Sequence, residues 1–194
     1  MNLSFKKYKI SFFIDKKDIE VECTKDNIIN ITGMIGSGKS TTANKYRKND
    51  QYIVISLDCL YRNQDKNHNN QETIKINQIL REKYPNQEKE EFFRNYYLEI
   101  LEYITNYSNE SVFWVLEGQH IYRFLNLEDI KGTLIIKRTS VFHCWIRSIK
   151  RHAKNRVDMW YWIKRRTKQI KYYRVLNKFL FSINHSNYKN KLID

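Results

Sequence analysis

Glycine and proline are scarce in this sequence of 194 residues. It contains five glycines and a single proline, Pro85, whereas average usage of about 7% would give roughly 14 glycines. Three of the five, Gly33, Gly36 and Gly38, lie within six residues of one another. Glycine is needed where the backbone adopts a positive φ or where another group approaches it closely. The concentration predicts that residues 33–38 form a functional loop.

Cysteines and long apolar runs are also few. The three cysteines, Cys23, Cys59 and Cys144, have no CxxC spacing, so the spacing suggests neither a zinc site nor a disulfide framework. No apolar run approaches the roughly 18 residues needed to span a bilayer, and lysines interrupt the first residues before a signal-type segment forms. Hydrophobic residues make up 41% of the chain, which excludes a disordered protein. We expect one cytoplasmic domain, residues 1–194, without membrane association.

Acidic residues are almost missing from residues 137–178. This window holds fourteen Lys and Arg residues but one acid, Asp158, and so carries +13 of the net charge of +14. Such a concentration of positive charge implies an anionic partner. This partner could be nucleotide phosphates, nucleic acid or a membrane surface.

The apolar pattern predicts short strands that alternate with helices. We expect an N-terminal hairpin within residues 1–26, built from strands at 5–14 and 17–23. Further strands are predicted at 27–32, 52–57, 112–116 and 133–137, and helices at 39–48, 73–84, 90–107, 140–153 and 158–181. Such alternation is typical of a parallel sheet covered by helices on both faces, so the predicted fold class is α/β.

The segment from Gly33 to Ser40, GMIGSGKS, satisfies the phosphate-loop (P-loop) pattern GxxxxGK[ST] and stands between a predicted strand and a predicted helix. In such a loop, backbone N–H groups and the start of the helix surround phosphate oxygens. Lys39 would bridge the β- and γ-phosphates of ATP, and we expect its side chain to be exposed until phosphate arrives. The hydroxyl of Ser40 would bind Mg²⁺. The residues expected to bind the nucleotide are Gly33, Gly36, Ser37, Gly38, Lys39, Ser40 and Thr41. The alternative is an ordinary turn with a surface lysine.

A phosphate loop does not by itself identify the reaction. The sequence has no LSGGQ-like signature of ABC cassettes and no NKxD motif that reads guanine. The predicted strand at 112–116 is followed by Glu117, where a carboxylate could hold Mg²⁺ through water or orient an attacking group.

Four segments in this order resemble small P-loop kinases of the nucleoside monophosphate kinase type. They are GMIGSGKST, VISLDCLY (54–61), FWVLEGQH (113–120) and LIIKRTSVFHCWIRSIKR (134–151). The resemblance covers about residues 28–180 and is nearest to adenylate-kinase-like proteins described as DNA topology modulation proteins. It implies a three-layer P-loop NTPase fold, ATP-dependent phosphoryl transfer and an arginine-rich lid near residues 150–160. It also implies an acceptor site at the ends of the predicted strands at 52–57 and 112–116. The N-terminal hairpin is an addition to the pattern of this family.

The expected acceptor site contains Asp58, Arg62, Glu117 and Gly118. Asp58 would take the proton of a hydroxyl acceptor, or orient Mg²⁺ or a sugar if the acceptor is a phosphate. The alternative is a purely structural role for Asp58 as the N-cap of a helix. Arg62 would clamp an acceptor phosphate or be merely solvated.

Arginines after the predicted strand at 133–137 are expected to stabilise the transferring phosphoryl group. Arg147 and Arg151 are four residues apart and therefore share a helix face, and Arg156 follows where a lid would turn. Arg165 and Arg166 resemble the arginine pair that follows the lid in monophosphate kinases. A solvated basic face is the alternative.

The remaining aromatic and imidazole side chains are given a structural role. Trp160, Tyr161 and Trp162 stand beside cations and could stack bases, but we expect a core stripe because Trp162 falls on the predicted inward face. The histidines show no ligand spacing and are assigned no chemistry.

Three functions fit the sequence. The first is a kinase, monomer or homodimer, that uses ATP and Mg²⁺ to phosphorylate a nucleotide or another small acceptor. The second is a nucleic-acid kinase whose residues 137–178 hold the polynucleotide. The third is a non-catalytic nucleotide-sensing module that binds nucleic acid. No motif distinguishes ATP from GTP.

Overall fold

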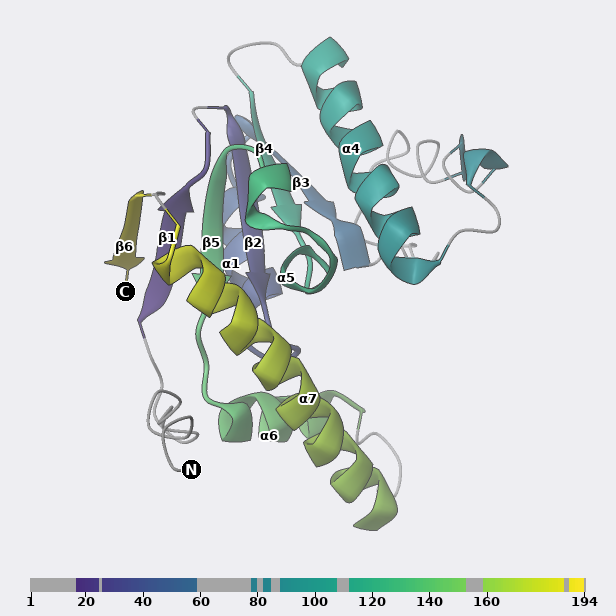
Figure 1. The fold of residues 1–194 in the computed structure, drawn as a ribbon, viewed down its shortest axis with the longest axis vertical. Helices are drawn as coiled ribbons and strands as arrows, with labels where there is room; N and C mark the ends of the chain where they lie inside the picture. Colours follow the sequence, from purple (N-terminus) through teal and green to yellow (C-terminus); the bar gives the residue numbers. More distant parts are fainter. Residues whose placement is uncertain are drawn as a thin grey trace.

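A mostly parallel sheet with helices on both faces forms the centre of the protein (Figure 1). The computed structural model describes residues 17–24, 26–58, 78–79, 82–84, 88–107, 112–152, 159–186 and 189–193. The six strands lie in the order β3-β4-β2-β5-β1-β6. Their bounds are Asp18–Glu22 (β1), Ile28–Gly33 (β2), Tyr52–Ser56 (β3), Phe113–Glu117 (β4), Thr133–Lys137 (β5) and Lys189–Ile193 (β6).

The helices form a layer on each side of this sheet. They are α1 (Lys39–Tyr46), α4 (Lys89–Tyr107), α5 (Ile121–Phe124), α6 (Val141–His152) and α7 (Met159–Asn184), with a 3₁₀ turn at Leu127–Asp129. Figure 1 shows α1 behind the sheet and α4, α5 and α7 in front of it. The predicted α/β class with a mostly parallel sheet is confirmed, and each helix predicted at 39–48, 90–107, 140–153 and 158–181 is present within a few residues.

Alternation of side chains along the strands explains the two layers. On β4, Trp114 and Leu116 join the large core that includes α4, α5 and α7, whereas Val115 joins the smaller core against α1. The same alternation holds on β5, where Leu134 and Ile136 face one side and Ile135 faces the other. Successive strand residues point to opposite faces, so these apolar runs are buried on both sides of the sheet.

The edge of the sheet differs from the prediction. β1 pairs antiparallel with β5 and also with β6, and the strand β6 was not predicted. A strand has two hydrogen-bonding edges, so β1 has no edge left for the hairpin partner predicted at 5–14, whose own residues lie outside those described. Most of the helix predicted at 73–84 lies outside them as well.

A tight turn before β5 ties the edge strands to the centre. Gly132 has φ +76°, and a Cβ there would lie 2.0 Å from the carbonyl oxygen of Ile28. Its own carbonyl accepts the N–H groups of Cys23 at 3.0 Å and Thr24 at 3.2 Å. The turn therefore requires glycine for both conformation and space.

Gly132→Ala should destabilise the protein strongly. Backbone strain costs about 1–3 kcal/mol and overpacking about as much, so we expect the free energy of unfolding to fall by about 3 kcal/mol in urea titrations. The neighbouring exposed residue gives the control, since Lys131→Ala leaves the backbone contacts in place and should change stability by less than about 0.5 kcal/mol. Equal unfolding midpoints for the two variants would contradict this account of the turn.

Candidate functional site

The segment between β2 and α1, residues 33–38, is here called the glycine loop. Its three glycines all have positive φ: 143° at Gly33, 85° at Gly36 and 97° at Gly38. A Cβ on Gly36 would lie 2.6 Å from the carbonyl oxygen of Cys144 on α6. The backbone requirement expected from the glycine cluster is confirmed, because the loop has both positive φ angles and a close approach of another segment. Its functional role stays a prediction.

Lys39, the first residue of α1, is buried rather than exposed. Its side chain is 6% exposed, and Nζ donates to the carbonyl oxygen of Met34 at 3.2 Å. The expectation of a side chain in solvent is wrong because the glycine loop folds around the ammonium group. An ammonium group is buried at acceptable cost only where opposite charge compensates it, and two carboxylates at the strand ends do so.

The first carboxylate, Glu117, ends β4. It accepts hydrogen bonds from the hydroxyl of Ser40 on Oε1 at 3.3 Å and from the hydroxyl of Ser56 on Oε2 at 3.2 Å. Burial raises the pKa of Glu117, against the charge of Lys39, which lowers it. The structure thus brings together Ser40 and Glu117, both predicted metal ligands. Ser56 was not predicted, although it ends the neighbouring strand in register with Glu117.

The second carboxylate, Asp58, lies just after β3. It accepts the backbone N–H groups of Gln119 at 3.0 Å and His120 at 3.3 Å, and its Oδ1 lies 2.5 Å from Nδ1 of His120. Burial alone would raise the pKa of Asp58, but the hydrogen bond to His120 and the charge of Lys39 hold it below its ordinary value. Gly118 leaves room for this contact, since a Cβ there would lie 3.1 Å from Oδ1 of Asp58.

Asp58 accepts backbone N–H groups from the segment after β4, 61 and 62 residues away. The residues that directly follow Asp58, on which the N-cap alternative depends, lie outside those described, so that alternative stays a prediction. The histidine that sequence reasoning left without chemistry, His120, is the side-chain partner of Asp58. The ring of His120 is held between those of Phe93 and Phe124, with centroids 5.3 and 5.2 Å away.

Three side chains from the part of the chain after β5 reach the glycine loop. Nη1 of Arg147 on α6 donates to the carbonyl oxygen of Gly36 at 3.4 Å. The hydroxyl of Thr139 donates to the carbonyl oxygen of Ser37 at 3.0 Å. Nε2 of Gln169 on α7 donates to the carbonyl of Ile35 at 3.2 Å. Arg147 was predicted to lie at the site, whereas Thr139 and Gln169 were missed.

Other predicted site residues are not brought to the loop or cannot be placed. Arg165 donates from Nε to the hydroxyl of Tyr161 at 3.0 Å, and Thr41 is exposed on the first turn of α1. Arg62, Arg156 and most of the predicted lid lie outside the described residues, as does the side chain of Arg151.

Several buried polar atoms around the loop have no hydrogen-bond partner. They are Oγ of Ser37, both carboxamide atoms of Gln119, Oη of Tyr122 and Oε1 of Gln169. More than nine in ten buried polar groups in proteins are hydrogen-bonded. Among the described residues, these atoms are therefore exceptions to the usual pairing of buried polar groups.

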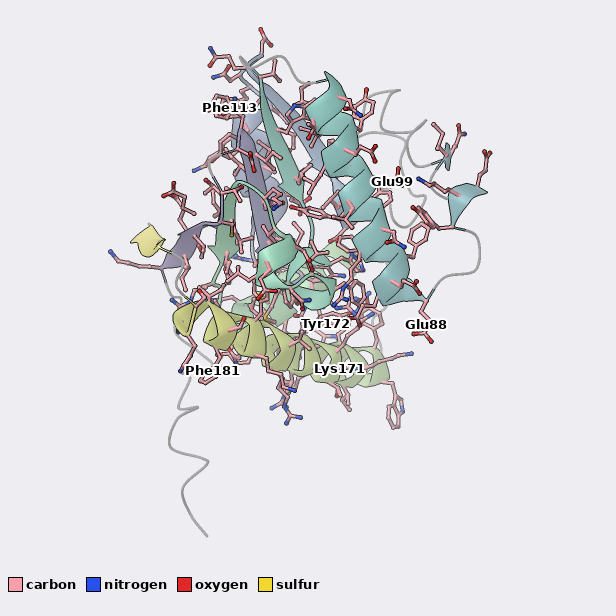
Figure 2. All side chains as sticks on the ribbon, turned by 45° about the horizontal axis from the view of Figure 1, so that its top comes forward. Glu88, Glu99, Phe113, Lys171, Tyr172 and Phe181 are labelled. Carbon is pink, nitrogen blue, oxygen red and sulfur yellow. The ribbon has the colours of Figure 1, made fainter. Side chains whose placement is uncertain are left out.

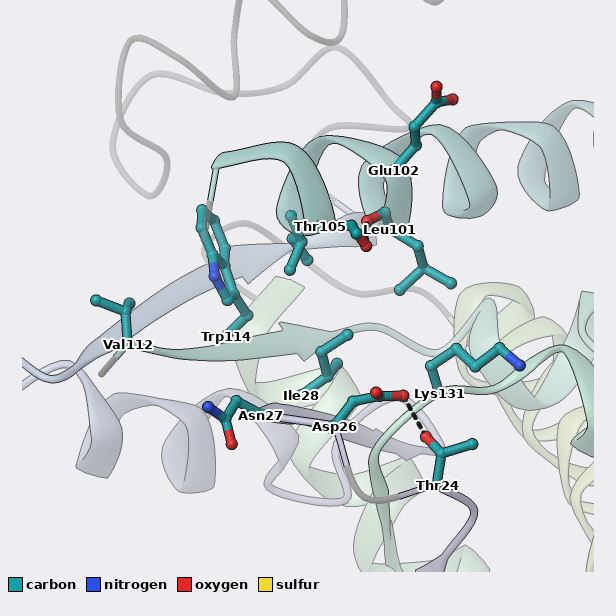
Figure 3. A pocket seen from close by; sticks show the side chains of 11 residues that line it. Thr24, Asp26, Asn27, Ile28, Leu101, Glu102, Thr105, Val112, Trp114 and Lys131 are labelled. Carbon is teal, nitrogen blue, oxygen red and sulfur yellow. Dashed lines mark hydrogen bonds between the residues drawn. The ribbon is translucent and has the colours of Figure 1, made fainter. Parts of the chain in front are cut away.

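A cavity of about 640 Å³ lies elsewhere, at the opposite ends of the strands (Figure 3). Ile28, where β2 begins, lines it together with Trp114, Glu102 and Asp26, and Asp26 accepts a hydrogen bond from Thr24. The glycine loop follows the other end of β2, so this cavity is not part of the candidate site.

Two features are absent from the described ranges of the chain. None of the helices found there is long and apolar enough to cross a membrane. The same residues contain no group of three or more His, Cys, Asp and Glu side chains that could hold a metal ion.

Comparisons with known proteins give a distant structural likeness. No family model and no curated protein matches the chain. A solved structure described as TT1252 from Thermus thermophilus is 17% identical with a TM-score of 0.40, and the match covers 78% of this chain and 80% of that one. A likeness at this level carries no argument about function.

Neutralising Glu117 should stabilise the protein. Since burial raises its pKa, the ionised side chain opposes folding at neutral pH, and this cost disappears as the pH falls through the raised value toward the ordinary 4.5. Glu117→Gln should therefore raise the melting temperature at neutral and alkaline pH, by an amount that shrinks on acidification. The exposed residue Glu128 is the control, because Glu128→Gln should not change the melting temperature. A lower melting temperature for Glu117→Gln at every pH would contradict the assigned direction.

Proposed function

We propose that this protein is a phosphotransferase that uses ATP and Mg²⁺ to phosphorylate a nucleotide or another small acceptor. The observation that carries the proposal is the buried ammonium group of Lys39 in a glycine loop, with Glu117 and Asp58 at the ends of the adjoining strands. Ligands of open α/β sheets bind outside the carboxyl ends of the strands. The finer fold assignment, a P-loop NTPase of the nucleoside monophosphate kinase type, belongs to this proposal.

The residues at the loop suit a nucleotide and a magnesium ion. Backbone N–H groups of the glycine loop and the start of α1 favour anionic oxygens, and Lys39 supplies a fixed positive charge. The oxygens of Ser40 and Glu117, 3.3 Å apart, are of the hard type that Mg²⁺ prefers, and this ion is held by one or two protein groups together with phosphates. When bound, the ion neutralises charge on the β- and γ-phosphate oxygens.

Arg147 supports the transfer reaction. Phosphoryl transfer depends mainly on positioning and on cations that stabilise charge spread over the equatorial oxygens. Arg147 reaches the glycine loop at Gly36, so its charge lies beside the expected phosphates. Its contact there is with a carbonyl oxygen, a weaker partner than phosphate, and the guanidinium is therefore available to bind an anion.

The surroundings of Asp58 favour one of its two expected roles. A general base works best with a pKa near the working pH, but the pKa of Asp58 is lowered. Its oxygens already accept hydrogen bonds from Gln119 and His120. We therefore assign Asp58 to positioning: it holds the segment after β4, with the carboxamide of Gln119 and the ring of His120, against the acceptor.

Removing the charge of Lys39 should abolish phosphoryl transfer. Lys39→Met keeps the length of the side chain but removes the cation, so transfer from radiolabelled ATP should become undetectable. ATP with Mg²⁺ should also raise the melting temperature of the unmodified protein, because a ligand at 100 times its Kd stabilises by about 2.7 kcal/mol, and the variant should lose most of this shift.

The control for this experiment lies on the same helix. Lys45 is exposed in the last turn of α1, so Lys45→Met removes an equal charge away from the loop and should leave transfer unchanged. Transfer by Lys39→Met at the rate of the unmodified protein would contradict the proposal.

A double-mutant cycle tests the positioning role of Asp58. Hydrogen bonds to charged groups contribute about 1.5–3 kcal/mol, so Asp58→Asn and His120→Gln should each lower kcat/KM by about 10- to 100-fold. If Asp58 acts through His120, the loss of kcat/KM in the double variant should be no larger than the loss in the less active of the two single variants. Fully multiplicative losses would show that the two side chains act separately.

A further inference from the structure

The solvent face of α7 carries a row of five cations, here called the cationic stripe: Lys164, Lys168, Lys171, Arg174 and Lys178. All five are exposed. Their spacing of four, three, three and four residues keeps them on one side of a helix with 3.6 residues per turn. Over fourteen residues the stripe extends about 21 Å at 1.5 Å per residue.

An exposed aromatic side chain stands at each end of the stripe. Trp160, one turn before Lys164, is 76% exposed, and Phe181, one turn after Lys178, is 44% exposed. Figure 2 shows α7 along the outside of the molecule, with Lys171 and Phe181 labelled on it. The prediction of a core role is therefore wrong for Trp160, and Trp162, 37% exposed, is not a core residue either.

The two basic helices carry no acid that would balance the charge. The helices α6 and α7 contain ten Lys and Arg residues and no Asp or Glu. Within the described residues, no carboxylate forms an ion pair with a cation of the stripe. A solvated face of an ordinary protein mixes both signs of charge, so this face is prepared for an anionic partner.

The stripe does not serve the phosphates of the candidate site. Gln169 on α7 donates a hydrogen bond to the glycine loop, and the five residues of the stripe lie about 100° to 180° around the helix from it, at 100° per residue. Buried Tyr173 and Leu176 lie on the inward side as well. Among the described cations of the +13 segment, Arg147 therefore lies at the loop and the stripe lies on the outside.

We propose that the cationic stripe binds single-stranded nucleic acid, with phosphates along the five cations and unpaired bases stacked on Trp160 and Phe181. Non-sequence-specific binding of single strands combines a track of positive charge with aromatic stacking platforms. Paired bases of a duplex do not offer their faces to such rings. A helix that lies on a membrane needs a continuous apolar face, but every exposed residue between Lys164 and Lys178 is polar.

Salt dependence of binding to a dye-labelled oligothymidylate, measured by fluorescence anisotropy without ATP, tests the stripe. Each phosphate contact on a single strand contributes about −0.7 to the slope of log K against log salt, so five contacts predict a slope of about −3.5. Replacing Lys164, Lys168 and Lys171 by Gln should flatten this slope by about 2. The matched control replaces three exposed lysines elsewhere, Lys45, Lys48 and Lys131, by Gln and should leave the slope unchanged.

A second pair of variants tests stacking. Trp160→Ala should weaken binding about tenfold or more without changing the slope, and Trp160→Phe should restore most of the affinity. Equal flattening by the control triple variant, equal affinity for duplex, or preference for vesicles of phosphatidylserine over the oligonucleotide would each overturn the proposal. Because the assay contains no ATP and Lys39→Met should bind the oligonucleotide normally, its outcome is independent of the proposed phosphotransferase activity.

Discussion

The ammonium group of Lys39 lies inside the protein, where a single charge without compensation would cost far more free energy than a domain has to spare. Its neighbours follow from that constraint. The glycine loop offers the carbonyl of Met34, β4 ends on Glu117, and β3 is followed by Asp58. The carboxylates respond differently to burial, since the pKa of Glu117 is raised and that of Asp58 is lowered. The difference arises because Asp58 receives N–H groups and an imidazole, whereas Glu117 receives two hydroxyl groups.

The parallel arrangement of β2, β3 and β4 makes this site possible. Strands that run in one direction bring their carboxyl ends to one edge of the sheet, so Gly33, Ser56 and Glu117 meet although they are far apart in the chain. The buried apolar side chains on both faces hold this edge rigid. The site thus stands on strand ends that are packed on both faces, the kind of support that preorganised electrostatic stabilisation requires.

Under our two proposals, the two basic helices let one charged segment serve two partners. Sequence places fourteen cations in residues 137–178, and a small acceptor with one triphosphate cannot use them all. Two helices share them: Arg147 on α6 contacts the glycine loop, while the five cations of the stripe on α7 face solvent. Under our two proposals, a nucleotide site and a polynucleotide surface lie on opposite sides of α7 and do not compete for the same charges.

Local patterns in the sequence determined the glycine loop and the order of strands and helices along the chain. These succeed because positive φ and side-chain periodicity are fixed by residues close together in the chain. Ser40 and Glu117 were both expected at the site, but their meeting across 77 positions is made by the parallel sheet. Tertiary structure decided the rest. The pair Asp58 and His120 joins residues 62 positions apart, Gln169 reaches Ile35 across 134 positions, and β6 was not predicted because a short polar strand such as KNKLI gains its stability from pairing with β1. The burial of Lys39 and the exposure of Trp160 also depend on which surfaces pack together, and that choice is made only when the whole chain folds.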